Sequence, residues 1–166
     1  MNKAINPFEN LAPSAHVYEH KFKLLRFINI SGREKSGKTS FLAELQEHLR
    51  VVHFDFEYGS NMLEEEKGYH FLRAKNYREA TAQKDFVKQN LAIIKPDIIA
   101  IDTLDKLEEY IIDYYCKING VKTLSETHFN IGYVEVRELL FNFINECKFM
   151  APLVITATHL NIKLLD

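Results

Sequence analysis

The chain of 166 residues is long enough for one domain with a real core, and 46% of its residues are hydrophobic and 27% are charged. This balance is typical of a globular protein and excludes a disordered, collagen-like or disulfide-scaffold chain. The formal net charge of -2 gives no overall attraction to nucleic acid or anionic membranes. Any polyanion would have to bind at a local patch or to an oligomer.

The sequence has no pattern typical of secretion or membrane insertion. Its first residues lack the apolar run of a signal peptide, and no window approaches the roughly 18 apolar residues of a membrane span. The two cysteines, Cys116 and Cys147, match no zinc, haem or redox spacing and are predicted to be reduced core thiols. We therefore expect a cytoplasmic protein with no membrane partner.

Strands and helices are predicted to alternate along the chain. Residues 1–22 have no hydrophobic periodicity and are predicted to form an N-terminal arm, and the core is expected over 23–166. A mostly apolar run over 24–31 predicts a buried parallel strand. Apolar residues at helical spacing predict an amphipathic helix over 37–50, and a short second strand is predicted over 51–54.

The second half continues the alternation. The stretch 60–77 is ambiguous: it holds an acidic run at 64–66, expected on a solvated face, and one candidate strand at 69–72. The remaining elements follow from the same patterns: a helix over 79–94, a strand over 98–101, a helix over 104–119, a surface loop over 120–131, a helix over 136–150 and a strand over 153–158. This alternation predicts an α/β fold with a parallel sheet and helices on both faces.

A phosphate-binding motif lies between the first predicted strand and helix. Residues 32–39 read GREKSGKT and match G-x-x-x-x-G-K-[ST] in full. Glycines let such a loop curl so that its N–H groups point at phosphate oxygens, and the following helix adds the positive end of its dipole. Lys38 is predicted to bridge the terminal phosphates and Thr39 to bind Mg²⁺. The predicted ATP-binding residues are Gly32, Arg33, Glu34, Lys35, Ser36, Gly37, Lys38, Thr39 and Ser40.

Three further side chains at predicted strand ends complete the candidate site. Asp102 is predicted to bind the metal with Thr39, because such a site needs a carboxylate at the end of a neighbouring strand. Glu57 is the candidate to orient or deprotonate the attacking water, and His159 to sense the terminal phosphate. The alternatives are a surface carboxylate in a turn and a histidine that merely ends a strand.

Over about residues 24–160 the chain resembles the RecA-like ATPase core, and within it the phage Sak-type single-strand annealing proteins. The resemblance rests on four segments: the GREKSGKT loop, the DFEYG element at 55–59, Asp102-Thr103-Leu104, and Thr158-His159. It implies that Glu57 is the catalytic glutamate and that His159 senses the terminal phosphate. It also implies that the last strand lies between the first strand and the strand that ends in Asp102.

We therefore predict a Mg²⁺-dependent ATP-binding protein and ATPase of RecA-like type. It is expected to act as a homo-oligomer in phage-type DNA recombination or annealing, with single-stranded DNA as the candidate partner. The chain ends seven residues after His159, so we expect the later strands and DNA-contacting loop of the resembled core to be missing, which leaves DNA binding and turnover open. The alternatives are a nucleoside or nucleotide kinase and a nucleotide-dependent assembly module without turnover.

Overall fold

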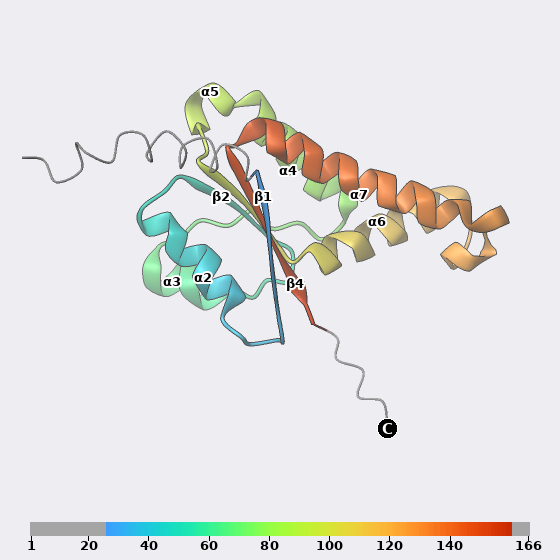
Figure 1. Ribbon diagram of the computed structural model, residues 1–166, viewed down its shortest axis with the longest axis horizontal. Helices are drawn as coiled ribbons and strands as arrows, with labels where there is room; N and C mark the ends of the chain where they lie inside the picture. Colours follow the sequence, from blue (N-terminus) through green and yellow to red (C-terminus); the bar gives the residue numbers. More distant parts are fainter. Residues whose placement is uncertain (1–25, 161–166) are drawn as a thin grey trace, which may run out of the picture.

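The computed structural model describes residues 26–160 and contains a four-stranded sheet whose strands all run parallel. The strand order is β1-β4-β3-β2 (Figure 1). The strands are β1 (Phe27–Gly32), β2 (Val51–Asp55), β3 (Ile98–Asp102) and β4 (Leu153–His159). This confirms the predicted α/β fold and the position of the last strand between the first strand and the strand of Asp102.

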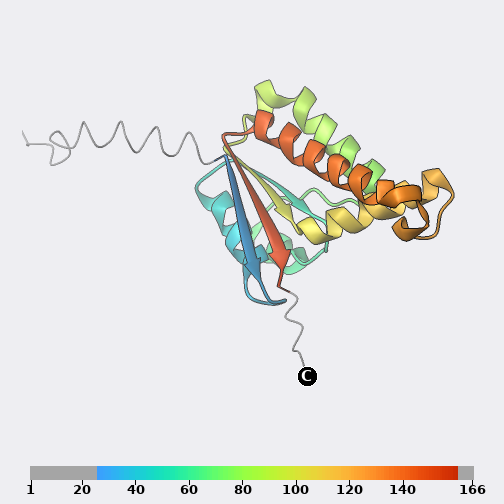
Figure 2. The same ribbon diagram turned by 45° about the vertical axis from the view of Figure 1, so that its right-hand side comes forward.

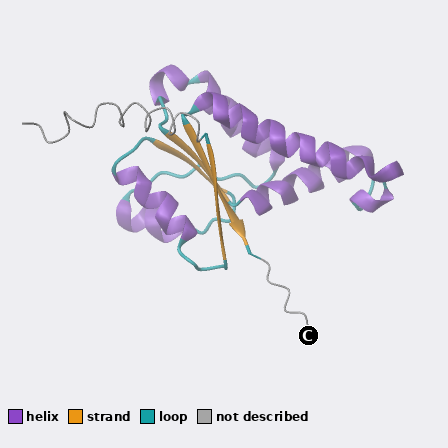
Figure 3. Cartoon of the chain, in the orientation of Figure 1, coloured by secondary structure: helices purple, strands orange, loops and turns teal. Residues whose placement is uncertain are grey.

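Helices cover both faces of the sheet, as Figures 2 and 3 show. On one face lie α2 (Lys38–Glu44), the 3-10 turn Leu45–Glu47 and α3 (Asn61–Lys67). On the other face lie α4 (Tyr77–Gln89), α6 (Leu104–Asn119) and α7 (Ile131–Met150). The short helix α5 (Leu91–Ile94) and the 3-10 turns Leu124–Glu126 and His128–Asn130 complete the described elements.

The strand β3 divides the interior into two apolar clusters. Ile99 and Ile101 belong to the larger cluster, with side chains of α4, α6 and α7. Ile98 and Ala100 belong to the smaller one, with Leu42 of α2. All five residues of β3 are buried, because a parallel strand covered by helices on both sides exposes neither set of alternating side chains.

The helix boundaries differ from the predicted ones for local reasons. The predicted helix at 79–94 begins at Tyr77, because the Asn76 side chain accepts a hydrogen bond from the Glu79 backbone N–H at 3.0 Å and donates one to the Glu79 carboxylate at 2.8 Å. It is interrupted at Asn90, after which α5 begins. The last long helix starts at Ile131, five residues earlier than the pattern indicated.

The ambiguous stretch 60–77 contains a helix that the sequence pattern did not predict. The acidic run lies in α3, which has no buried residue and ends at Gly68 in the left-handed conformation, φ 68°. The candidate strand at 69–72 reduces to a single bridge between Leu72 and Phe54 of β2. The predicted arm at 1–22 lies outside the described residues.

No helix within residues 26–160 is long and apolar enough to cross a membrane.

Both cysteines are buried free thiols, as predicted. Burial raises the pKa of Cys147 to about 12 and also raises that of Cys116, so the reactive thiolate is rare at pH 8.

We expect iodoacetamide at pH 8 to label neither thiol of the folded protein, and both after unfolding in urea, as measured by mass spectrometry. Rapid labelling of the native chain would contradict this.

The assignment of the core can be tested by replacing a buried and an exposed phenylalanine of α7 and comparing the stability of the two variants. Phe143 is 1% exposed and lies edge-on to Phe54 at 6.0 Å between ring centroids, whereas Phe141 is 55% exposed. We expect Phe143→Ala to lower the free energy of unfolding by about 3–5 kcal/mol in urea denaturation, because it leaves a cavity in the core. Phe141→Ala is the matched control, and an equal loss in both variants would show that the core is misassigned.

Candidate functional site

The phosphate-binding motif forms a curled turn between β1 and α2. Gly37, which precedes α2, has a φ of 85°, and Lys35 also has a positive φ. A Cβ atom at Gly32 would lie 2.6 Å from Ser36 Oγ, so a larger residue there would have to displace the serine hydroxyl. The predicted residues Arg33, Glu34 and Ser40 are exposed, which leaves the outer side of the turn open to a ligand.

Lys38 lies in the first turn of α2 and is only 8% exposed. Its ammonium donates hydrogen bonds to the carbonyl oxygens of Gly32 at 3.0 Å and Arg33 at 2.9 Å. These bonds offset the cost of burying the charge and hold it inside the curl of the turn. The sequence motif predicts this lysine in a phosphate-binding loop. In the structure its ammonium is held in that loop by the two carbonyl oxygens.

Asp102 ends β3 and is 2% exposed, yet neither of its carboxylate oxygens has a hydrogen-bond partner within the described residues. The buried imidazole of His53 lies beside it, with Nε2 3.7 Å from Asp102 Oδ2, outside hydrogen-bond distance. A buried carboxylate without hydrogen bonds is costly, and oxygen ligands of this kind suit Mg²⁺. The residue therefore fits the predicted metal site.

Thr39, the other predicted magnesium ligand, lies in the first turn of α2 next to the loop after β2. Its Oγ1 would be 3.8 Å from a Cβ atom at Gly59. Within residues 26–160, no three His, Cys, Asp or Glu side chains are grouped to hold a metal ion by themselves. A magnesium ion here would therefore need phosphate oxygens or water besides Thr39 and Asp102.

Glu57 and His159, far apart in sequence, lie side by side. His159 Nδ1 is 3.4 Å from Glu57 Oε1, and the same carboxylate oxygen accepts a hydrogen bond from Thr103 Oγ1 at 2.8 Å. The backbone N–H of His159 donates to Asp105 Oδ2 at 2.7 Å. Two candidate residues and the first turn of α6 thus form one polar cluster.

This cluster lines a cavity of about 460 Å³. Arg33 and Glu34 of the phosphate-binding turn share it with Glu57 and His159, so four of the predicted residues meet in one space. Lys38, Thr39 and Asp102 do not line it. The remaining lining residues are Asp105, Glu109 and Leu160.

Sequence reasoning gave Asp105 no role, and it included Thr103 only as part of the Asp102-Thr103-Leu104 segment of the resemblance. Thr103 caps α6 by accepting a hydrogen bond from the Lys106 N–H at 3.3 Å, and Asp105 lies in the first turn of that helix. A threonine followed by an acidic residue at a helix start is a common capping pattern, so it gave no signal of a functional site.

The two acidic residues of the element at 55–59, Asp55 and Glu57, have different roles in the structure. Asp55 is buried and accepts hydrogen bonds from the N–H groups of Gly59 at 3.3 Å and Ser60 at 3.2 Å, and from the Ser60 hydroxyl. Arg73 Nε lies 3.4 Å from the same carboxylate. Asp55 therefore fixes the loop that carries Glu57, while Glu57 itself remains exposed to the cavity.

The two polar residues at the end of β4, Thr158 and His159, make contacts with different parts of the site. The Thr158 hydroxyl lies 2.7 Å from Ser31 Oγ and accepts a hydrogen bond from Asn29 at 3.2 Å, in a polar cluster shared with β1. Only His159 lines the cavity.

A family model described as "AAA domain" matches residues 26–164, which include every residue of this site. The chain belongs to this family. The AAA domain is a P-loop domain of nucleotide-binding ATPases, which confirms the coarser predictions of a P-loop NTPase fold and nucleotide binding. The comparison with curated proteins finds no match.

The cost of burying the Asp102 carboxylate without hydrogen bonds can be tested by melting temperature, with no nucleotide present. In EDTA, we expect Asp102→Asn to raise the melting temperature, because an uncharged amide of the same shape costs less to bury. For a chain of this size about 1 kcal/mol corresponds to roughly 2–4 °C. Asp113→Asn, at an exposed position on α6, is the control. A lower melting temperature for Asp102→Asn would show that the charge is compensated.

Proposed function

We propose that this chain is a Mg²⁺-dependent ATPase whose hydrolytic group is Glu57. The observation that supports this most directly is the meeting of Glu57, His159 and the phosphate-binding turn in one cavity. A carboxylate within reach of the last phosphate is what water activation requires. Membership of the AAA-domain family supports a nucleotide bound at the adjoining turn.

Lys38 and the backbone N–H groups of residues 33–38 would hold the phosphates. The lysine is already oriented by two carbonyl oxygens of the turn, so little side-chain freedom is lost on binding. Thr39 and Asp102 would hold Mg²⁺. When bound, the ion neutralises charge that develops on the phosphate oxygens.

Glu57 would orient the attacking water and accept its proton. The hydrogen bond from Thr103 holds one carboxylate oxygen, and the bonds of Asp55 hold the loop behind it. His159 would donate a hydrogen bond to the terminal phosphate, because it ends the strand between β1 and β3 and borders the same cavity. Hydrolysis would change that contact and so report the state of the nucleotide.

We further propose that the protein acts as a homo-oligomer in DNA recombination or single-strand annealing. The resemblance to Sak-type proteins supports the process. Large apolar side chains on the outer side of α7 support self-association, since exposed apolar groups gathered on one helix commonly mark an interface. These side chains are Ile131, Val134, Phe141 and Phe149, and the last is 84% exposed. Light scattering with and without Mg·ATP measures the assembly directly.

Nucleotide binding is tested by Lys38→Ala. We expect loss of detectable Mg·ATP binding in isothermal titration calorimetry, because the terminal phosphates lose their buried cation. Lys67→Ala, an exposed lysine at the end of α3, should bind as the wild type does. Retained affinity in Lys38→Ala would overturn the assignment of the turn.

Hydrolysis is tested by Glu57→Gln, with phosphate release measured with and without single-stranded DNA. We expect a fall in kcat of about 10²–10⁴-fold with ATP binding retained, since the amide cannot accept the proton. Glu108→Gln, an exposed glutamate of α6, is the matched control. Wild-type binding without turnover would favour the assembly module, and phosphate transfer to a nucleoside would favour the kinase.

A further inference from the structure

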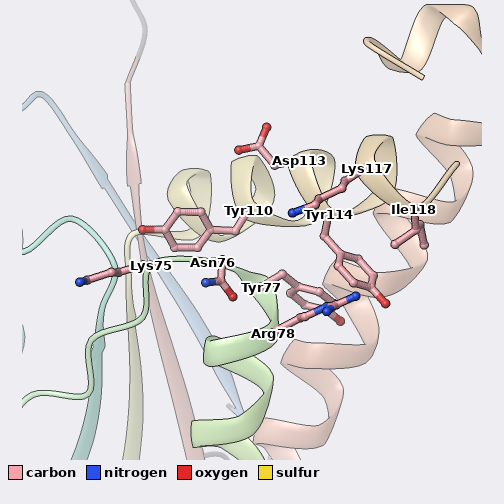
Figure 4. Close-up of a pocket in the computed structure, with 9 residues that line it drawn as sticks. All are labelled: Lys75, Asn76, Tyr77, Arg78, Tyr110, Asp113, Tyr114, Lys117 and Ile118. Carbon is pink, nitrogen blue, oxygen red and sulfur yellow. The ribbon is translucent and has the colours of Figure 1, made fainter. Parts of the chain in front are cut away.

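A second pocket, of about 410 Å³, lies between the start of α4 and the middle of α6. It shares no lining residue with the cavity of Glu57 and His159. Three tyrosines line it: Tyr77, Tyr110 and Tyr114. In Figure 4 the rings of Tyr77 and Tyr114 lie side by side between the two helices, and the Tyr110 ring lies apart from them, toward the sheet.

The tyrosine rings are held in place before any ligand binds. Tyr77 and Tyr114 lie 5.2 Å apart between ring centroids, with a tilt of 53°. The Tyr110 hydroxyl shares its single proton between the carbonyl oxygens of Phe56 at 3.2 Å and Ala74 at 3.1 Å. All three residues are half-buried, so each ring is partly covered by protein and partly accessible at the pocket. Fixed aromatic faces bind a planar group at little cost in side-chain entropy.

Three cationic side chains line the same pocket. Lys75, Arg78 and Lys117 are exposed, and within the described residues none of them forms an ion pair with a carboxylate. The Arg78 guanidinium lies 5.7 Å from the centroid of the Tyr114 ring. Asp113 is the one carboxylate among the lining residues, so the pocket carries more positive than negative charge. In Figure 4, Lys75 lies on the side of the pocket nearer Tyr110, and Arg78 lies beside Tyr77 and Tyr114 on the other side.

We propose that this pocket binds a nucleotide unit of single-stranded nucleic acid. A base would stack on Tyr77 and Tyr114, and the phosphates on either side would contact Arg78, Lys117 and Lys75. Stacking on aromatic rings combined with cations along the backbone is the chemistry by which proteins hold single strands without reading sequence. The recessed rings favour unpaired bases, because the bases of a duplex are already stacked on one another.

Cations on opposite sides of the pocket favour a strand over a free nucleotide. A mononucleotide carries phosphate at one side of its base, whereas a strand carries one on each side. A free nucleotide also contains an aromatic base and a phosphate. It is therefore the alternative ligand that the experiment must distinguish from a strand.

The test uses the full chain with a fluorescently labelled oligothymidine of about 15 nucleotides, in low salt and without ATP or Mg²⁺. Binding is followed by fluorescence anisotropy. Because nucleotide and metal are absent, a failure of the proposed ATPase activity does not affect the result. We expect saturable binding that weakens as salt increases, since each phosphate contact releases a counterion.

Charge and stacking are tested separately. Arg78→Glu and Lys117→Glu change exposed side chains and should each weaken binding about tenfold or more. Lys67→Glu on α3, at the opposite face of the sheet, is the matched control and should bind nearly as the wild type does. Tyr114→Leu should weaken binding by about fivefold or more, and Tyr114→Phe should restore it, because the ring is what stacks.

Melting temperatures of all variants show that each is folded. Three results would overturn the proposal: Arg78→Glu and Lys117→Glu bind as Lys67→Glu does, Tyr114→Leu binds as Tyr114→Phe does, or a duplex of equal length binds as tightly as the single strand. Competition with thymidine monophosphate and with inorganic phosphate identifies the source of the ligand. If the monophosphate displaced the oligonucleotide at equal nucleotide concentration, the pocket would bind a free nucleotide. The proposal that its ligand is a single strand would then be wrong.

Discussion

The parallel register of the four strands is the constraint on which the candidate site depends. Gly32 at the end of β1 pairs with His159 at the end of β4, and Asp102 at the end of β3 pairs with Asp55 at the end of β2. Because all strands run in the same direction, their polar ends meet at one edge of the sheet. A shift of one residue in any strand would turn these side chains to the other face and separate the phosphate-binding turn from Glu57.

The site retains buried charge that the fold does not fully compensate. Lys38 is satisfied by two carbonyl oxygens of its own turn, whereas Asp102 has no hydrogen-bond partner among the described residues. A site prepared for a cation and phosphate has to bury such groups before the ligand arrives, and this lowers the stability of the free protein. The ligand would supply the missing interactions, so binding and folding stability are linked.

The helix α6 connects the two cavities physically. Its start carries Thr103 and Asp105, which contact Glu57 and His159, and its middle carries Tyr110 and Tyr114 of the tyrosine pocket. Tyr110 also donates a hydrogen bond to the carbonyl of Phe56, the residue before Glu57. The loop of Glu57 is therefore held at two points, by Thr103 at the start of α6 and by Tyr110 in its middle.

The sequence determined those features that depend on neighbouring residues. GREKSGKT identified the phosphate-binding turn because the motif is contiguous in the chain, and its Gly37 has the positive φ that favours glycine. The apolar run at 98–101 predicted β3 because both faces of that strand are covered. Only the tertiary structure decided that Glu57 meets His159, that Asp55 supports a loop, and that three tyrosines from two helices surround one pocket. These features are contacts between residues far apart in the chain, and they exist only once sheet order and helix packing are set. Hydrophobic periodicity reports which side of an element is buried and carries no information on its partner.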